Sequence, residues 1–181
     1  MKGDNKDMLP VNPRLSLVLG GARSGKSVFA ENLICSSPSP WIYVATAEAL
    51  DAEMVERVAT HRARRDARWL TIEAPHQLAA ALVESPKGSP LLVDCLSFWL
   101  SNRLLAGADL HAEIEVVVDA LHSRNAVTVA VSSEVGLGIV PENALARNFR
   151  DASGDLHQAV ARIAGSVTLM IAGCPLQLKK P

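Results

Sequence analysis

The stretch that decides the fold of this chain is Gly20-Gly21-Ala22-Arg23-Ser24-Gly25-Lys26-Ser27, at residues 20–27. It satisfies the phosphate-loop pattern G-x-x-x-x-G-K-[ST], in which successive backbone N–H groups surround an anion. An apolar run at 15–19 precedes it and predicts a short buried strand, while residues 28–34 after it predict a helix. Strand, loop and helix in this order are the context in which the pattern binds phosphate.

Each part of this loop suits the binding of a nucleoside triphosphate. The glycines allow the backbone to wrap an anion, and the start of the helix adds the positive end of its dipole. Lys26 is placed to reach the β- and γ-phosphates, and the Ser27 hydroxyl to ligate Mg²⁺. The alternative is a glycine-rich turn before an ordinary helix. We predict that all of residues 20–27 bind nucleotide and that Lys26 is catalytic.

The composition of the chain indicates one globular domain. It has 181 residues, 49% of them hydrophobic, and a net charge of −1. This near-neutral balance predicts no nucleic-acid partner, and no apolar run is long enough to predict a membrane span. Three cysteines, far apart and odd in number, favour buried thiols over disulfides or zinc. We expect a flexible tail at 1–13, one domain at 14–181 and a cytoplasmic location.

Apolar runs alternate with helical stretches along the chain. Strands are predicted at 15–19, 41–45, 69–72, 90–93, 126–131 and 167–171. Helices are predicted at 28–34, 51–66, 75–84, 96–105, 112–123 and 142–164, with a short tail after Gly173. Asp51 is the expected N-cap of the second helix, and a break near Gly154 is left open in the last. Continuous apolar strands separated by helices predict an α/β fold, a single P-loop NTPase domain with a mostly parallel sheet and helices on both faces.

Ligands of open α/β sheets bind at the carboxyl ends of the strands. The segments expected there are the phosphate loop and the residues from Thr46, Asp94 and Ser132 onward. Asp94 ends an apolar strand, as the second Walker motif requires, where a carboxylate can hold Mg²⁺ directly or through water. The alternative role for Asp94 is a helix cap. Given the phosphate loop, we predict that Asp94 is a metal ligand.

A cationic stripe marks the predicted helix at 51–66. Arg57, His61 and Arg65 follow one another at i, i+4 and i+8, which brings them to neighbouring parts of one helix surface. A charge run on a helix is usually a solvated face. From spacing alone we therefore favour that interpretation.

Three segments together resemble a known family, and the resemblance covers the chain from about Leu15. They are 20–27, then Glu53-Met54…Arg57…His61-Arg62…Arg65…Trp69, and Glu134-Val135-Gly136-Leu137-Gly138-Ile139-Val140-Pro141-Glu142-Asn143…Leu145-Ala146-Arg147…Phe149-Arg150-Asp151. The family is the bifunctional adenosylcobinamide kinase / adenosylcobinamide-phosphate guanylyltransferase of cobalamin biosynthesis. One departure is Ser133, where the family commonly has Asn.

The resemblance implies two reactions and a set of site residues. ATP or GTP phosphorylates the aminopropanol hydroxyl of adenosylcobinamide, and GTP then transfers GMP to adenosylcobinamide phosphate through a histidine that matches His61. The positions that match the GTP site are Ala45, Thr46, Ala47, Arg62, Ala63, Arg64, Arg65, Glu73 and Asp94. Whether Glu73 and Asp94 contact guanine or the metal stays open, and the family resemblance predicts a homotrimer.

The glycine-containing loop after the strand at 126–131 has two interpretations. Gly136 and Gly138 either allow a tight turn with positive φ or allow close approach of the backbone to the corrinoid arm or a phosphate. We favour the second, because the loop follows a strand end, and we take Glu134, Gly136 and Gly138 as substrate-loop candidates. Arg147 and Arg150 either serve phosphates or cover the following helix.

Two other functions compete with the bifunctional enzyme. A kinase of another small metabolite would transfer phosphate without forming a covalent nucleotide on His61. A non-catalytic nucleotide switch would lack both activities, and the chain has no Asn-Lys-x-Asp box of regulatory GTPases. The covalent adduct is therefore expected only of the bifunctional enzyme, and phosphoryl transfer separates the kinase from the switch.

Overall fold

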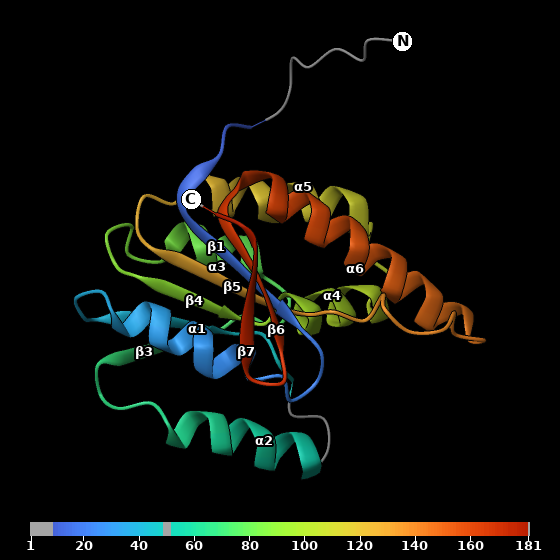
Figure 1. Ribbon diagram of the computed structural model, residues 1–181, viewed down its shortest axis with the longest axis horizontal. Helices are drawn as coiled ribbons and strands as arrows, with labels where there is room; N and C mark the ends of the chain where they lie inside the picture. Colours follow the sequence, from blue (N-terminus) through green and yellow to red (C-terminus); the bar gives the residue numbers. More distant parts are fainter. Residues whose placement is uncertain (1–8, 49–51, 181) are drawn as a thin grey trace.

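The computed structural model describes residues 9–48 and 52–180, except for the side chains of Glu53, Arg57 and His61 (Figure 1). Strands and helices alternate along most of the chain. The strands are β1 (Asn12–Gly20), β2 (Trp41–Ala45), β3 (Trp69–Glu73), β4 (Leu91–Asp94), β5 (Thr128–Ser133), β6 (Ala164–Ile171) and β7 (Cys174–Lys179). The helices are α1 (Lys26–Cys35), α2 (Ala52–Ala63), α3 (Leu78–Glu84), α4 (Leu96–Leu105), α5 (Leu110–His122) and α6 (Ala144–Ile163).

The described strands form one sheet in the order β3-β2-β4-β5-β1-β6-β7. The first six run parallel, and β7 pairs antiparallel with β6. The predicted α/β fold with a mostly parallel sheet is therefore confirmed. β5 lies between β1 and β4, so its carboxyl end separates the phosphate loop from Asp94.

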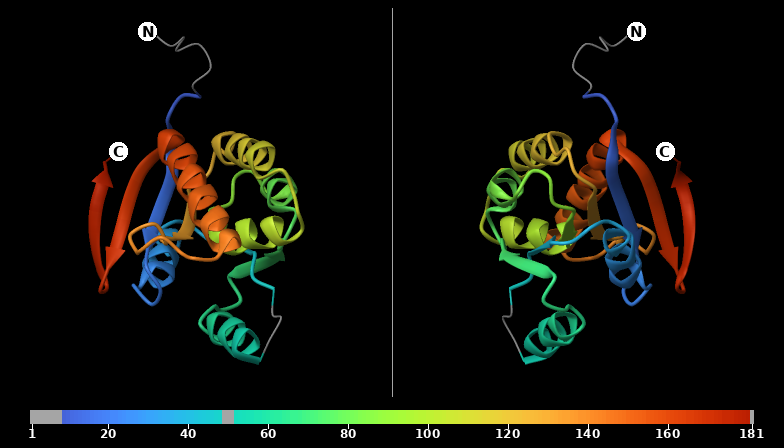
Figure 2. Two further views of the ribbon diagram at one scale, coloured as in Figure 1. Left: turned by 90° about the vertical axis from the view of Figure 1, so that its right-hand side faces the viewer. Right: turned by 90° about the vertical axis from the view of Figure 1, so that its left-hand side faces the viewer.

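Helices cover both faces of the sheet, as predicted (Figure 2). On one face α3, α4, α5 and α6 enclose the larger core, in which Leu15, Leu17 and Trp99 are almost completely buried. On the other face α1 packs on Val18 and Val131. α2 stands apart from the other helices (Figures 1 and 2). It lies beyond the part of the sheet that contains β2 and β3.

The short tail predicted after Gly173 is wrong, because Cys174–Lys179 form β7. Ala172 and Gly173 make the turn between β6 and β7 with φ of 50° and 80°. Pro175 hid this strand, since proline removes a backbone donor and argues against a central strand. β7 is an edge strand, where a missing N–H costs little.

The end of α2 and the start of α3 also differ from the prediction, since α3 begins at Leu78 rather than at Pro75. α2 ends at Ala63 rather than near Asp66, because the Asp66 side chain accepts the N–H of Arg68 at 2.9 Å and forms a turn instead. α6 continues through Gly154, where an added Cβ would meet no atom within 4 Å. Burial of Leu156 and Val160 on the same helix outweighs the roughly 1 kcal/mol that glycine costs there.

The chain before the first strand is only partly described. Residues 1–8 of the predicted tail, and the predicted N-cap Asp51, lie outside the described residues. β1 begins at Asn12, so 12–13 belong to the strand. The buried Asn12 amide donates to the carbonyls of Leu121, His122 and Arg124, and so ties the start of β1 to the end of α5. Among the described helices, none has the length and apolar character needed to cross a membrane.

Candidate functional site

The phosphate loop connects β1 to α1 in the predicted strand–loop–helix context. Gly25 precedes α1 with φ of 92°, a left-handed conformation that glycine adopts without strain. Gly20 has no room for a side chain, since a Cβ there would lie 2.7 Å from the carbonyl oxygen of Met170. Lys26 is buried, and its Nζ donates to the carbonyl oxygen of Gly21 at 2.8 Å. The lysine therefore reaches back across the loop.

Two distant segments hold this loop in place. The N–H of Glu134, just after β5, donates to the carbonyl of Gly20 at 3.0 Å. The N–H of Gly173, in the β6–β7 turn, donates to the carbonyl of Ser24 at 3.0 Å. The hairpin that the sequence did not reveal is thus a support of the phosphate loop.

One cleft joins residues from α1, α2 and the ends of β2, β3 and β4. Among the residues predicted from the sequence, it is lined by Lys26, Ser27, Ala45, Ala47, Arg62, Arg65, Glu73 and Asp94. Parallel strands end at the same edge of the sheet, which explains how positions so far apart in the sequence meet. The phosphate loop and the candidate guanine contacts therefore share one site.

The cleft also has walls that were not among the individually predicted site residues. They are formed by Tyr43, Met54, Val58, Thr71 and Phe98, and by Cys95 and Ser133, which belong to the segments expected at the strand ends. Met54, Val58 and Arg62 lie at i, i+4 and i+8, so one face of α2 lines the cleft. In the sequence, the apolar residues Met54 and Val58 beside the cationic stripe were the signal that this face of α2 lines a cleft.

Arg65 was predicted to lie on the helix at 51–66, but α2 ends at Ala63. Arg65 follows in the turn after it, where its guanidinium group stacks on Tyr43. Its Cζ lies 3.4 Å from the centre of the tyrosine ring. Its Nε and Nη1 are buried and have no hydrogen-bond partner among the described residues. Buried donors without a partner are costly, and a bound anion would satisfy them. Arg65 is therefore a candidate receptor for a phosphate or a base carbonyl.

Tyr43 connects Arg65 to Asp94. The tyrosine hydroxyl donates to Asp94 Oδ2 at 2.9 Å. Burial raises the pKa of Tyr43 well above its ordinary value, and the charge of Asp94 raises it further. The hydroxyl therefore stays protonated and orients the Asp94 carboxylate at the end of β4.

Replacing Arg65 by lysine is expected to weaken GTP binding by about tenfold or more. Lysine keeps the charge but loses the planar group on Tyr43 and the fixed N–H donors. A hydrogen bond to a charged group contributes about 1.5–3 kcal/mol, and about 1.4 kcal/mol corresponds to tenfold in affinity. Isothermal titration calorimetry with GTP and Mg²⁺ measures the change.

The matched control is Arg68→Lys. Arg68 also stacks on an aromatic ring, with its Cζ 4.5 Å from the centre of Trp41, but it is exposed and hydrogen-bonds to Asp66. We expect its affinity for GTP to change by less than about twofold. Equal losses in the two variants would contradict a direct role for Arg65.

Some predicted site residues lie away from the cleft. Thr46 is completely buried, and its Oγ1 donates to the carbonyl of Cys95 at 2.6 Å and accepts its N–H at 2.8 Å. Arg64 forms an ion pair of 3.4 Å with Glu31 of α1. Ala63 is exposed at the end of α2. Thr46 therefore joins β2 to β4 rather than facing a ligand.

For His61, the covalent nucleophile inferred from the family resemblance, the structure describes the backbone, which belongs to α2, but not the side chain. Its role stays a prediction. So do the roles of Gly21, Ala22 and Arg23, which are exposed in the loop.

The structure does not support the alternative interpretation of the loop after β5, in which its glycines allow a tight turn with positive φ. Gly136 and Gly138 are absent from the described glycines that have positive φ. Gly136 instead makes a close approach within the protein, because a Cβ there would lie 2.9 Å from Glu134 Oε1. The Gly136 N–H donates to that oxygen at 2.5 Å.

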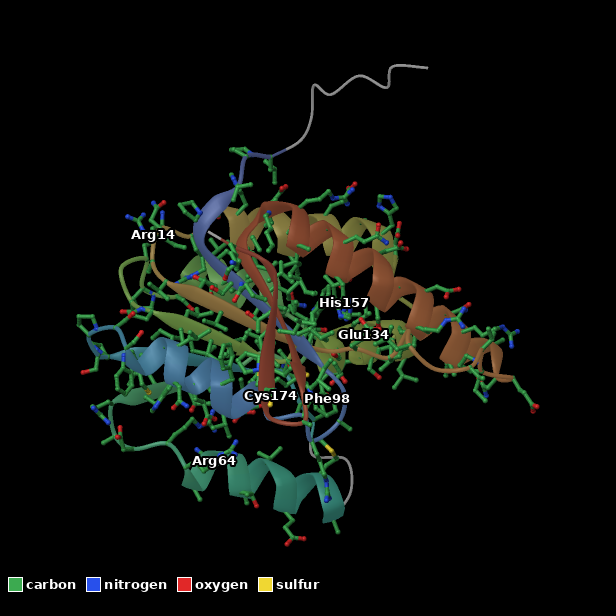
Figure 3. The ribbon with its side chains drawn as sticks, viewed as in Figure 1. Arg14, Arg64, Phe98, Glu134, His157 and Cys174 are labelled. Atoms are coloured by element: carbon green, nitrogen blue, oxygen red, sulfur yellow. The ribbon has the colours of Figure 1, made fainter. Side chains whose placement is uncertain are left out.

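Behind the cleft, Glu134 contacts a buried histidine of α6 (Figure 3). His157 Nδ1 lies 3.4 Å from Glu134 Oε2, and its Nε2 lies 2.7 Å from Ser132 Oγ. Burial lowers the pKa of His157 and outweighs the attraction of the Glu134 carboxylate. His157 is therefore neutral near pH 7. Nothing in its sequence position on α6 indicated this contact.

The oxygen donors of the cleft suit Mg²⁺. Ser27 offers a hydroxyl and Asp94 a carboxylate, and both line the cleft beside Lys26. The described residues contain no group of three or more His, Cys, Asp or Glu side chains that would make a dedicated metal cage. Mg²⁺ bound with nucleotides commonly takes one or two protein ligands together with phosphate oxygens and water. The donor set therefore fits a nucleotide-bound Mg²⁺.

Comparison with known proteins gives a family match over most of the chain. The family described as cobinamide kinase / cobinamide phosphate guanyltransferase matches residues 16–178. The bifunctional adenosylcobalamin biosynthesis protein CobP of Pseudomonas aeruginosa is 48% identical over 166 residues, which is 90% of this chain and 96% of that protein. The bifunctional adenosylcobalamin biosynthesis protein CobU of Salmonella typhimurium is 36% identical over 179 residues, 90% of this chain and 98% of that protein.

Solved structures share the fold at low sequence identity. The flagellar accessory protein FlaH from Methanocaldococcus jannaschii aligns with a TM-score of 0.53 at 11% identity, covering 94% of this chain and 80% of that one. A protein from Pyrococcus horikoshii OT3 aligns with a TM-score of 0.53 at 13% identity, covering 95% and 89%. At such identity, the likeness supports the fold alone.

Proposed function

Because this chain belongs to the cobinamide kinase / cobinamide phosphate guanyltransferase family, we propose that it catalyses two reactions. It first phosphorylates the aminopropanol hydroxyl of adenosylcobinamide with ATP or GTP. It then transfers GMP from GTP to adenosylcobinamide phosphate, giving adenosylcobinamide-GDP and pyrophosphate. The observation that carries the proposal is the single cleft in which the phosphate loop faces one side of α2.

The kinase step needs charge neutralisation more than covalent chemistry from the protein. The substrate oxygen forms a bond to the γ-phosphorus, and the bond to the β–γ bridging oxygen breaks to release the nucleoside diphosphate. Lys26 balances the charge of the phosphates, and the loop N–H groups hold their oxygens. Ser27 and Asp94 would hold Mg²⁺ together with phosphate oxygens, and the ion would supply further positive charge.

In the second step His61 is the proposed nucleophile. A ring nitrogen of the neutral imidazole attacks the α-phosphorus of GTP, pyrophosphate leaves, and the enzyme carries GMP on a phosphorus–nitrogen bond. The phosphate of adenosylcobinamide phosphate then displaces the histidine and takes the GMP. Helical spacing supports this role, because residue 61 follows Met54 by seven positions and Val58 by three, and both of these line the cleft.

The arginines beside the cleft suit the charge of both steps. Arg62 lines the cleft from the end of α2, and Arg65 follows with two buried nitrogens that have no partner among the described residues. Guanidinium groups fork onto phosphate oxygens and stay charged at any working pH. Glu73, at the end of β3, is the proposed acceptor for guanine N–H groups. The residues after β5, with Glu134, Gly136 and Gly138, are proposed to meet the substrate arm.

The assay that tests this function follows the products from adenosylcobinamide. With ATP and Mg²⁺, chromatography and mass spectrometry should detect adenosylcobinamide phosphate alone. Adding GTP should convert it to adenosylcobinamide-GDP with release of pyrophosphate. A substrate analogue without the terminal hydroxyl is the control and should give neither product. Phosphorylation of another alcohol but not of adenosylcobinamide would contradict the proposal.

The proposal also includes the oligomeric state of the protein and the compartment in which it acts. We propose a homotrimer on the family resemblance. We also propose that the reactions take place in the cytoplasm, where both nucleotides are available. The thiols of Cys35, Cys95 and Cys174 are all free, which suits a reducing compartment. Only Cys95 is buried as predicted, because Cys35 and Cys174 are exposed.

A further inference from the structure

Glu134 occupies a central position at the carboxyl edge of the sheet. It directly follows β5, which lies between the phosphate-loop strand β1 and the Asp94 strand β4. Ser133 before it lines the nucleotide cleft, and the N–H of Glu134 donates to the carbonyl of Gly20. The acceptor of a phosphoryl group must approach the γ-phosphate from this edge. Glu134 therefore lies at the edge of the sheet from which a substrate hydroxyl would approach.

A chain of hydrogen bonds behind Glu134 includes His157. Ser97 Oγ accepts the N–H of Ser133 at 2.5 Å and lies 2.9 Å from Ser132 Oγ, which lies 2.7 Å from His157 Nε2. Because an ionised carboxylate only accepts, we assign the proton of the neutral ring to Nδ1, which lies 3.4 Å from Glu134 Oε2. Nε2 then accepts from Ser132.

Both oxygens of the Glu134 carboxylate are thereby oriented. Oε2 faces His157, and Oε1 accepts the Gly136 N–H, while a Cβ at residue 136 would lie 2.9 Å from Oε1 and displace it. The side chain of Glu134 is still 21% exposed, whereas that of His157 is 8% exposed. The carboxylate is thus oriented by two contacts and remains partly exposed.

The placement of this anion calls for an explanation beyond packing. A carboxylate next to a phosphate-binding loop is repelled by the ligand that the loop is built to hold. A glutamine has no such repulsion, but it could accept only one of the hydrogen bonds from Gly136 and His157, because its second terminal atom is a donor. A carboxylate differs from an amide in that it can take up a proton.

We propose that Glu134 accepts the proton of the substrate hydroxyl during phosphorylation, and that His157 is a positioning residue that holds its carboxylate. This inference rests on the proposed kinase activity. As the hydroxyl oxygen bonds to the γ-phosphorus and the nucleoside diphosphate leaves, the hydroxyl proton passes to Glu134, which later releases it to water. The guanylyl transfer involves no substrate hydroxyl and does not need this step.

The test compares the two half-reactions in Glu134→Gln. We expect kcat for phosphorylation of adenosylcobinamide to fall about 10²–10⁴-fold, the usual contribution of a general base. KM for ATP and the rate of GMP attachment from GTP should each stay within about threefold, because neither uses the carboxylate as a base. Glu142→Gln, at an exposed glutamate of the same loop, is the matched control and should leave both half-reactions unchanged.

A pair of glycine variants tests the position of the carboxylate without changing its chemistry. Gly136→Ala places a Cβ 2.9 Å from Glu134 Oε1 and should displace it, lowering kcat of the kinase step at least about tenfold. Gly88→Ala, in the turn before β4 and outside the cleft, is the control, since a Cβ there meets no atom within 4 Å. For His157, alanine should lower the same kcat, and asparagine, which retains an N–H donor, should restore most of it.

The outcomes separate this inference from the proposed function. If the wild type phosphorylates adenosylcobinamide and Glu134→Gln does so at a similar rate, the assignment of Glu134 is overturned while the function stands. A parallel loss of phosphorylation and GMP attachment in Glu134→Gln also overturns it, because the role would then be structural. If the wild type itself gives no phosphorylated product, the proposed function fails and the inference fails with it.

Discussion

Replacing His61 by alanine is expected to abolish attachment of GMP to the protein and to lower formation of adenosylcobinamide-GDP at least about 10³-fold. No other step of the proposed mechanism uses this side chain, so phosphorylation of adenosylcobinamide should stay within about threefold of the wild-type rate. Intact-mass spectrometry after incubation with GTP and Mg²⁺ measures the adduct, which should be labile in acid. A kinase assay on the same preparation measures the first reaction.

His111→Ala is the matched control for this variant. His111 lies on α5 with its side chain 85% exposed, and its replacement should leave the adduct unchanged. Persistence of the adduct in His61→Ala would mean that another residue carries GMP. Absence of an adduct in a wild-type protein that binds GTP would favour a kinase without the covalent step.

The second large effect is expected for Lys26→Ala, which should lower both reactions about 10²–10³-fold. Lys26 is buried beneath the phosphate loop and reaches back to the carbonyl of Gly21, so its charge is directed at the bound phosphates. Because one cleft contains both Lys26 and the proposed guanine contact Glu73, the same lysine should serve ATP in one step and GTP in the other. Steady-state kinase rates and the rate of GMP attachment measure the two effects.

Lys87→Ala, at an exposed lysine away from the cleft, controls for the loss of a positive charge. Thermal unfolding of Lys26→Ala should match that of the wild type in the absence of nucleotide and lose the stabilisation that GTP gives. Full retention of GMP attachment in Lys26→Ala would show that the two nucleotides use different phosphate sites.

The parts of the fold that could be predicted from the sequence are those with local signals. The phosphate loop is a contiguous pattern, and the strand that ends at Asp94 is an uninterrupted apolar run, so both were placed correctly. β7 was missed because Pro175 contradicts a central strand, and only the position of β7 at the edge of the sheet makes it acceptable. Burial of the apolar face of α6 likewise overrode the break left open at Gly154.

The site was predictable to the extent that strand ends converge. Glu73 and Asp94 met Lys26 in one cleft because their strands are parallel. The stacking of Arg65 on Tyr43 was not predictable, since it depends on where α2 ends. The contact of His157 with Ser132 spans 25 positions between a helix and a strand, and no local spacing rule connects them. Such contacts follow from packing rather than from periodicity.

The β6–β7 turn supports the phosphate loop, and this has a consequence for the order in which the two segments reach their final structure during synthesis. The carbonyl of Ser24 receives its hydrogen bond from Gly173, a residue translated long after the loop itself. During synthesis the nucleotide-binding motif therefore emerges first but cannot take its final shape until the last hairpin docks beside β1. A nascent chain stalled before that hairpin would carry the complete motif in its sequence but would lack the hydrogen bond from Gly173 that holds the Ser24 carbonyl.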